Sequence, residues 1–303
     1  MFVFVVVRLL SFLLCVLTSY IFHLPPSLQD CADSNNDYLA VDFLEGSEKS
    51  IASNKLKRDA VRTALATVSD HNVVYFSSRT NYIDAKIAQW VAAGDVSQIV
   101  SVAAGFDSRA YRLPSLNQSI DFFELDMPEV VADKQARVAA NNLSCVARSC
   151  TYVGADLRNI TVGDALRNET KFSASAQTVY VVEGLIYYLH QPDVDKLFTS
   201  LAEVASKGSK VVFDFTNKCI VESDCKDLNK QLTEIFLEIM HVKHEPWFSG
   251  FGPGTIIPYM EKLGLETTEL LSFQDAHGLP LNVSTYYGSK IFGQMNFMTL
   301  ERK

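Results

Sequence analysis

The sequence predicts an α/β fold in which a parallel sheet is covered by helices on both faces. From residue 50 onward, apolar runs typical of strands alternate with segments whose apolar residues recur at helical spacing. The strand-like runs, such as residues 178–182 (TVYVV), are continuously apolar, as expected for strands buried on both faces. The chain has 303 residues, of which 48% are hydrophobic and 20% charged, so it can bury a large core.

The individual elements follow from periodicity and from residues that start or stop them. Pro128 is placed to open a helix at its first turn, and Gly94 and Gly208 to follow helix ends. Helices are predicted at 55–68, 82–93, 128–141 and 192–205. Strands are predicted at 98–102, 120–125, 150–153, 178–182, 210–215, 267–273 and 292–300. Residues 218–264 are predicted to be a mostly helical insertion, with an aromatic loop at 245–254.

Charge and cysteine usage exclude several classes of protein. The chain carries 27 Lys and Arg against 35 Asp and Glu, a net charge of −8, which argues against nucleic acid as a partner. Its six cysteines include no C-x-x-C pair, and the six histidines show no metal-ligand or triad spacing. We therefore expect no metal site.

The N-terminus is a separate unit. Residues 2–24 contain a single charged residue, Arg8, over a length that can span a bilayer, and Pro25-Pro26 follow. Residues 1–26 are thus either a cleaved signal peptide or an uncleaved anchor giving membrane association, or else an artefact of gene modelling or a buried helix. Residues 27–49 are polar and predicted to be a linker, which leaves 50–303 as the main domain.

Five N-x-[ST] sequons favour the secretory route: Asn117, Asn142, Asn159, Asn168 and Asn282. Five cysteines remain outside the apolar segment, and an odd number leaves one unpaired in an oxidising lumen. We expect a membrane-anchored or secretory protein, or a cytoplasmic one if the N-terminal segment is an artefact.

Four residues of interest follow four successive predicted strands: Gly105, Asp126, Asp156 and Glu183. Ligands of open α/β sheets bind at this edge, where a glycine turn admits the ligand and an acid accepts from ribose hydroxyls. NAD enzymes and enzymes that use S-adenosylmethionine (SAM) share these features. The segment A-A-G-F-D lacks the third glycine of the NAD fingerprint, and Asp107 would repel a pyrophosphate but tolerate a sulfonium. The sequence therefore favours SAM.

Several motifs then resemble one family. V-A-A-G-F-D-S-R-A-Y-R-L (102–113) resembles the G-A-G-x-D-[ST]-R-x-x-R-L signature of the leucine carboxyl methyltransferase family. The family's next three motifs resemble F-E-L-D-M-P-E-V (123–130), G-A-D-L-R (154–158) and V-E-G-L-I-Y-Y-L (182–189). Its cap helices resemble 56–61 and 78–84, and a segment of its small-molecule branch resembles E-P-W-F-S-G-F-G (245–252).

The resemblance implies a Rossmann-like SAM methyltransferase fold. Its mostly parallel sheet would have seven strands, with helices on both faces and an N-terminal helical cap. It also implies O-methylation of a carboxylate, on a protein C-terminal leucine or on a small molecule. A carboxylate acceptor is already ionised at neutral pH and needs no general base, and we identify none. We therefore assign no catalytic residue, and expect catalysis by positioning with Glu183 as the nearest candidate.

The resemblance also implies the cofactor-binding residues. Lys57 and Arg79 would lie near the SAM carboxylate, and Ala103 and Gly105 would line the turn. Asp126 would bind the ribose, Asp156 and Leu157 the adenine, and Glu183 the methionine portion.

Structural roles compete with these assignments. Lys57 is one of several cations on a helix, Arg79 has Asp84 or another carboxylate as an alternative partner, and we expect Asp107 and Arg109 to brace the loop together. Tyr187 and Tyr188 suit the core, and residues 245–252 suit either a lid or an ordered loop.

Two departures from the family's pattern matter. Ala103 stands where the family usually has glycine, and the aromatic, Cys-containing tail of the protein-phosphatase branch is missing, because the chain ends F-M-T-L-E-R-K. The first departure favours an alternative function, a membrane-anchored SAM-fold binding protein without catalysis. The acids kept at three strand ends argue for the enzyme.

Overall fold

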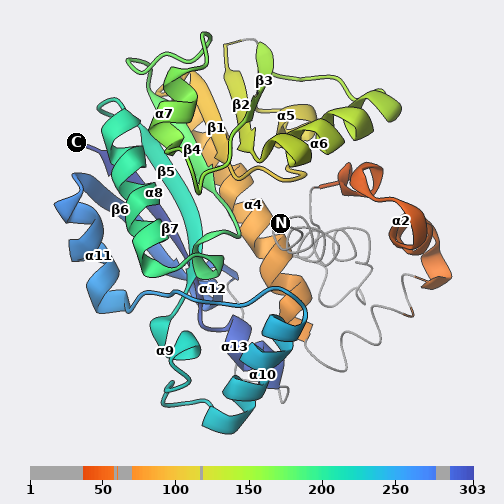
Figure 1. Cartoon of the computed structure of the whole chain (residues 1–303), viewed down its shortest axis with the longest axis vertical. Coiled ribbons are helices and arrows are strands. Elements are labelled where there is room, and N and C mark those ends of the chain that lie inside the picture. The colour runs from red at the N-terminus through yellow and green to blue at the C-terminus, as the bar shows by residue number, and fades with distance from the viewer. Residues whose placement is uncertain (1–36, 58–59, 61–69, 117–118, 278–286) are drawn as a thin grey trace.

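The structure is a computed structural model, and it describes residues 37–57, 60, 70–116, 119–277 and 287–303. A seven-stranded sheet forms its centre (Figure 1). The strands are β1 (Gln98–Val102), β2 (Asp121–Asp126), β3 (Ser149–Gly154), β4 (Thr178–Val182), β5 (Lys210–Thr216), β6 (Leu265–Ser272) and β7 (Met295–Arg302). Their order is β3-β2-β1-β4-β5-β7-β6, and β7 alone runs opposite to the other six strands. The predicted seven-stranded, mostly parallel sheet is confirmed.

Helices fill the connections between strands. They are η2 (Ala40–Phe43), α2 (Gly46–Ser53), α4 (Asp70–Ala93), α5 (Arg109–Arg112), α6 (Pro128–Ala140), α7 (Val162–Arg167), η3 (Ile186–Tyr188), α8 (Gln191–Val204), α9 (Lys218–Val221), α10 (Lys230–Val242), α11 (Pro253–Lys262), α12 (Phe273–His277) and α13 (Tyr287–Phe292). Pro128 stands at the start of α6, and Gly94 follows α4 with a φ of 75°, as the sequence predicts.

The core has two apolar layers, one on each face of the sheet. Val100 and Val102 of β1 contribute to a layer that α7, α8 and α11 cover. Ile99, which precedes Val100, points to the other face and packs with residues of α4 and α5. This alternation along a fully buried strand is the reason why the strand sequences are continuously apolar, and it confirms helices on both faces.

Two boundaries differ from the prediction for physical reasons. Helix α4 spans Asp70–Ala93, whereas the sequence predicted a helix only from residue 82. The earlier turns were missed because the buried polar side chains Ser77, Ser78 and Thr80 interrupt the apolar periodicity. The last strand runs from Met295 to Arg302, not from 292 to 300. Its charged end pairs with β6, where Arg302 lies opposite Leu265.

Part of the predicted linker packs against the domain. Phe43 is fully buried, and its carbonyl oxygen accepts a hydrogen bond of 2.7 Å from Nη1 of Arg137. Ala40, Phe43 and Leu44 are buried against the domain. They are few within a polar stretch, so composition alone does not reveal this packing. Residues 1–36, with the apolar segment 2–24, lie outside the described residues, as does most of the predicted cap helix over 55–68. None of the described helices has the length and hydropathy needed to cross a bilayer.

The insertion at 218–264 contains α9, α10 and α11, with an extended aromatic loop before α11. Trp247 of this loop is buried against Tyr187, with ring centroids 4.8 Å apart, and Phe251 is buried as well. A Cβ on Gly250 would lie 2.8 Å from the carbonyl oxygen of Thr216, so only glycine lets the loop approach β5 this closely. The loop is therefore an ordered part of the core, from which Phe248 alone is exposed among its aromatic residues.

Candidate functional site

The carboxyl ends of the central strands border two cavities. The smaller, of about 90 Å³, is lined by the turn after β1 and by residues of α4 and of the β4 end. The larger, of about 300 Å³, is lined by the ends of β2 and β3, by η3 and by α8. Ala103 lines both. The cavities lie at the switch point where β1 has β2 on one side and β4 on the other, which is where open α/β sheets bind ligands.

The turn after β1 and the end of β2 hold each other in place. Ala103 and Gly105 have φ values of 53° and 50°, in the left-handed region. The Gly105 N–H donates to Oδ2 of Asp126 at 2.6 Å, and the Met127 N–H donates to Oδ1 at 2.7 Å. These two bonds fix the Asp126 carboxylate at the edge of the larger cavity, which it lines.

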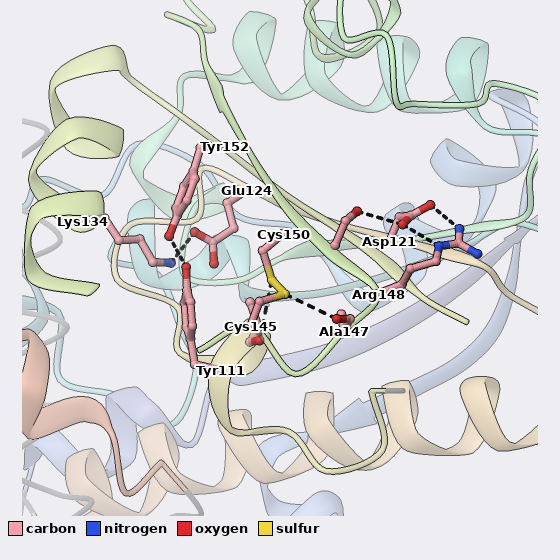
Figure 2. Close-up of a disulfide and its surroundings, with 11 residues drawn as sticks. Tyr111, Asp121, Glu124, Lys134, Cys145, Ala147, Arg148, Cys150 and Tyr152 are labelled. Atoms are coloured by element: carbon pink, nitrogen blue, oxygen red, sulfur yellow. Dashed lines mark hydrogen bonds and ion pairs between the residues drawn. A yellow bond between two sulfur atoms is a disulfide. The ribbon is translucent and has the colours of Figure 1, made fainter. Parts of the chain in front are cut away.

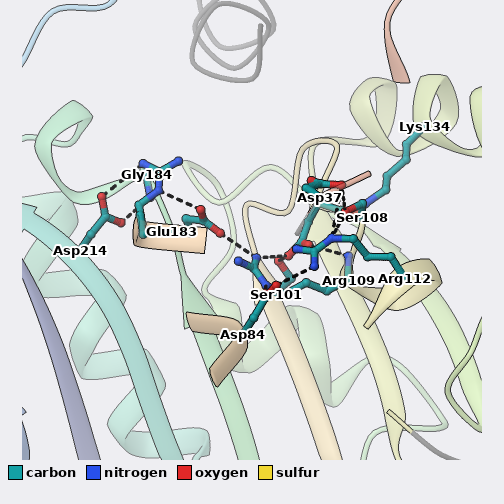
Figure 3. Close-up of polar contacts among 12 residues, drawn as sticks. Asp37, Asp84, Ser101, Ser108, Arg109, Arg112, Lys134, Glu183, Gly184 and Asp214 are labelled. Atoms are coloured by element: carbon teal, nitrogen blue, oxygen red, sulfur yellow. Dashed lines mark hydrogen bonds and ion pairs between the residues drawn. The ribbon is translucent and has the colours of Figure 1, made fainter. Parts of the chain in front are cut away.

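Glu183, directly after β4, joins two buried guanidinium groups (Figure 3). Its Oε1 accepts from Nε of Arg79 at 2.8 Å, and its Oε2 accepts from Nη1 of Arg109 at 2.7 Å. Burial disfavours the charged carboxylate, but Arg109 and Arg79 outweigh burial and lower the pKa of Glu183. Glu183 is therefore ionised at neutral pH, and its carboxylate is held on both sides.

The ion pairs continue behind the turn after β1. Asp107 accepts from Nη1 of Arg109 at 3.0 Å, and Asp84 of α4 accepts from Nε of Arg109 and from Nη1 of Arg112, both at 2.6 Å. Burial opposes the charge on Asp107, yet Arg109 and Lys134 lower its pKa to about 2. The expectation that Asp107 and Arg109 brace the loop is confirmed.

Asp214 of β5 anchors the other end of this network. Its Oδ2 accepts from the Tyr75 hydroxyl at 2.5 Å and from Nη1 of Arg79 at 3.4 Å, and its Oδ1 accepts from the Gly184 N–H at 2.6 Å. Gly184 has a φ of 61°, and a Cβ there would lie 3.0 Å from Nη1 of Arg79. Asp214 is a structural partner that sequence analysis missed; its signal is a lone acid inside the apolar run K-V-V-F-D-F.

The charges of the network do not cancel. Three guanidinium groups (Arg79, Arg109, Arg112) face five carboxyl groups (Asp37, Asp84, Asp107, Glu183, Asp214). Nη2 of Arg79 and Nη2 of Arg109 donate no hydrogen bond to any residue in the described part of the chain. The network beside the smaller cavity thus has more acids than guanidinium groups, and it includes two guanidinium nitrogens without a partner among the described residues.

The larger cavity is mostly apolar. Leu157, Ile160, Leu185 and Leu197 line it, and at one side His190 stacks on Phe248 with ring centroids 4.0 Å apart. This lining suits a flat aromatic base.

Asp156 lies at the same cavity but is paired with a neighbour. Nε and Nη2 of Arg158 donate to its two oxygens at 2.8 and 2.7 Å, and Nδ2 of Asn159 donates at 3.0 Å. Hydrogen bonds from Arg158 lower the pKa of Asp156. A bond from adenine to Asp156 would therefore share this carboxylate with Arg158.

Seven of the eight residues predicted to bind the cofactor line the cavities. Arg79, Gly105 and Glu183 line the smaller one, and Asp126, Asp156 and Leu157 line the larger, with Ala103 between them. Lys57 lines neither cavity; it is exposed, and its Nζ donates to Oγ of Ser50 at 2.7 Å. Contact of these residues with a ligand stays a prediction.

Sequence analysis left other lining residues unassigned. Asp37 and Arg112 line the smaller cavity, while His190 and Phe248 line the larger, as does Tyr188, which was expected to suit the core. Tyr187 is buried and accepts from Nη1 of Arg79 at 3.2 Å, as a core residue would. Within the described residues, no group of His, Cys, Asp and Glu could hold a metal ion.

Comparison with known proteins places this site in a family. The family model described as leucine carboxyl methyltransferase matches residues 30–202. A relative from Mycolicibacterium vanbaalenii, described as "Putative S-adenosyl-L-methionine-dependent methyltransferase", is 34% identical over 160 residues, which are 52% of this chain and 50% of its own length. A protein of Mycobacterium bovis with the same description is 35% identical over 145 residues, 48% of this chain and 46% of its own. The chain spans about half the length of the curated relatives it matches.

A solved structure supports the fold over nearly the whole chain. The crystal structure of a "putative methyltransferase" from Thermobifida fusca superposes with a TM-score of 0.58 at 14% identity, covering 92% of this chain and 98% of the other. The family match spans more than half of the 303 residues and includes the turn after β1 and the ends of β2, β3 and β4. The chain belongs to the leucine carboxyl methyltransferase family.

Proposed function

We propose that this protein binds SAM at the carboxyl edge of the sheet and transfers its methyl group to a carboxylate. Membership of the leucine carboxyl methyltransferase family supports both the reaction and the kind of acceptor. The observation that carries the proposal most directly is the pair of cavities meeting at Ala103, with Asp126 beside one and the Arg79–Glu183–Arg109 chain beside the other.

The residues around the cavities fit the parts of SAM. Asp126 lines the larger cavity, where a carboxylate suits ribose hydroxyls, and the apolar lining of that cavity suits adenine. At the smaller cavity, Nη2 of Arg79 and of Arg109 are donors for a carboxylate, while Glu183 and the surplus of acids favour an amine and a sulfonium. SAM carries a net positive charge at neutral pH, which matches the net negative charge of the network.

The chain would act mainly by orientation. SAM, when bound, supplies a methyl group that is already activated on a sulfonium. Glu183 is a weak base here, because Arg109 and Arg79 lower its pKa. We infer that Glu183 and Arg79 fix the position of the methionine portion, and that a carboxylate acceptor reacts without losing a proton.

The acceptor class can be tested by the lability of its product. The full chain would be incubated with methyl-labelled SAM and a panel of C-terminal leucine peptides, small carboxylic acids, phenols and alcohols. Methyl esters release volatile labelled methanol in base, whereas methyl ethers do not. Base-labile label that appears only with carboxylic acids supports the proposal, and base-stable label on phenols or alcohols contradicts it.

A non-catalytic binding protein is the second candidate, and Ala103 is the observation that favours it. Its Cβ stands at the junction of the cavities on a left-handed backbone where glycine is unstrained. In that case the protein would bind SAM, or a molecule like it, and label no acceptor.

We also propose that residues 2–24 attach the chain to a membrane. Flotation of the full chain with vesicles would test this, with a chain lacking residues 2–24 as the control.

A further inference from the structure

Three N-x-[ST] sequons fall within the described residues, and they differ in their hydrogen bonds and in their position in the fold. Their asparagines, Asn142, Asn159 and Asn168, are all exposed. Exposure alone therefore does not separate them. The three sequons differ in the hydrogen bonds of the asparagine amide and of the Ser or Thr hydroxyl two residues later.

Two of these sequons are free at both ends. The side-chain amides of Asn142 and Asn168 form no hydrogen bond with any described residue, and the same holds for the exposed hydroxyls of Ser144 and Thr170. Asn142 has a φ of 53° in the turn that follows α6, and Asn168 follows the last residue of α7. Both present an unengaged amide on a surface turn.

The third sequon is engaged at both ends. Nδ2 of Asn159 donates to Oδ2 of Asp156 at 3.0 Å. The Thr161 hydroxyl donates to Oδ2 of Asp164 at 2.7 Å and accepts from the Asp164 N–H at 3.1 Å, which makes it the N-cap of α7. Modification of Asn159 would alter a contact of a cavity residue.

Position in the fold separates the sequons in the same way. A helix between parallel strands returns the chain to the amino end of the next strand. Asn142 lies between α6 and β3 and Asn168 between α7 and β4, so both lie at the edge opposite the cavities. Asn159 lies after β3, between Arg158 and Ile160, which line the larger cavity. Large groups on Asn142 and Asn168 would leave the site open.

The cysteines give an independent indication of the compartment. A disulfide joins Cys145 to Cys150, linking the segment that contains Ser144 to β3 (Figure 2), and a second joins Cys219 to Cys225. Every cysteine in the described part of the chain is therefore paired. Disulfides persist in the secretory pathway and are rare in the reducing cytosol.

We propose that Asn142 and Asn168 carry N-linked glycans in an oxidising secretory compartment, and that Asn159 stays unmodified. In each transfer, the asparagine Nδ2 loses one proton and bonds to C1 of the first sugar. That sugar leaves its lipid-linked pyrophosphate donor, and the lipid pyrophosphate departs as the leaving group. The proposal does not depend on methyl transfer.

The test uses the full chain expressed in a eukaryotic host. Peptide:N-glycosidase treatment in heavy-oxygen water converts each glycosylated asparagine to labelled aspartate, which peptide mass spectrometry assigns to a residue. We expect labelled aspartate at 142 and 168 and unlabelled asparagine at 159. Label at 159, or its absence at 142 or 168, overturns the proposal.

Two further measurements test the proposal without peptide:N-glycosidase. Asn142→Gln and Asn168→Gln should each migrate faster on a gel than the wild-type chain, by the mass of one glycan. Asn159→Gln should migrate with the wild-type chain. Alkylation without a reductant should leave all four cysteines at 145, 150, 219 and 225 unlabelled. Full alkylation of these cysteines in the freshly isolated chain would place the domain in a reducing compartment and overturn the proposal.

Discussion

At the scale of single residues, Ala103 has a backbone conformation that carries an energetic cost. The backbone there has a φ of 53°, a conformation that costs L-residues about 1–2 kcal/mol and that glycine adopts freely. The next residue, Ala104, is also partly buried but has no positive φ. The two neighbouring alanines therefore form a matched pair.

We expect Ala103→Gly to raise the free energy of unfolding by about 1 kcal/mol, because it removes the strain of the left-handed alanine. Ala104→Gly should lower it by about 0.5–1 kcal/mol, because glycine only adds chain entropy there. Urea unfolding of both variants measures the difference. Equal destabilisation by the two would show that the turn after β1 does not strain Ala103.

Seven of the eight residues predicted to bind the cofactor line the cavities, and their contact with a ligand stays a prediction. All of the seven except Arg79 lie at or just after strand ends, and parallel strands bring their carboxyl ends to one edge. Partners that come from elsewhere were missed. Asp214 and Asp37 reach the network from β5 and from the polar N-terminal segment, and no local pattern indicates which guanidinium group they meet.

At the scale of elements, a buried ion pair joins β2 to α6. Nζ of Lys134 lies 2.8 Å from Oε2 of Glu124 and also donates to the Asp107 carbonyl oxygen at 2.6 Å, so the pair connects the core to the turn of the site. Burial raises the pKa of Glu124 to about 7, although Lys134 acts in the opposite direction. Tyr111 and Tyr152, whose hydroxyls are hydrogen-bonded, stand beside it (Figure 2).

This raised pKa makes stability depend on pH. The folded protein binds the Glu124 proton more tightly than the unfolded chain, so the stabilisation is complete below about pH 4.5 and is lost as the pH rises through about 7. We expect the free energy of unfolding of the wild type, relative to Glu124→Gln, to fall between these values. Glu129→Gln, at an exposed position of α6, should retain the wild-type slope. An unchanged slope in Glu124→Gln would refute this assignment.

Elements were predicted well where apolar periodicity is undisturbed, and less well where polar residues are buried. The five central strands lie within a residue or two of their predicted bounds. The first part of α4 was missed because Arg79 and its polar neighbours are buried in the network, and residues 37–49 were taken for a linker because few of them are apolar. In both segments tertiary contacts supply the stabilisation, and a single sequence does not show such contacts.

At the scale of the whole molecule, strand order explains how distant residues converge. β1 lies between β2 and β4, and β4 lies beside β5, so Asp126, Glu183 and Asp214 reach one edge although many residues separate them. The antiparallel β7 fills the position between β5 and β6. The sequence analysis predicted a mostly parallel sheet of seven strands but no strand order, because the order of motifs along the chain does not show which strands are neighbours.

The proposed reaction predicts a particular pH dependence. Because a carboxylate acceptor needs no base, kcat/KM should stay constant from about pH 6 to 9. His190 is the only histidine among the described residues that line either cavity, and it stacks on Phe248. We expect His190→Gln to leave the flat profile unchanged. A fall in kcat/KM as the pH drops through the usual range of histidine, absent in His190→Gln, would instead indicate a base, and an alcohol or phenol as the acceptor.

The measurement that tests the central claim most directly is calorimetric titration of the full chain with SAM, repeated with Asp126→Ala. Asp121→Ala is the matched control, since Asp121 begins the same strand β2 at the edge away from the cavities. We predict micromolar binding that is at least tenfold weaker in Asp126→Ala and unchanged in Asp121→Ala. A folded wild-type chain that binds no SAM, or binds it equally well without Asp126, would contradict the proposed site.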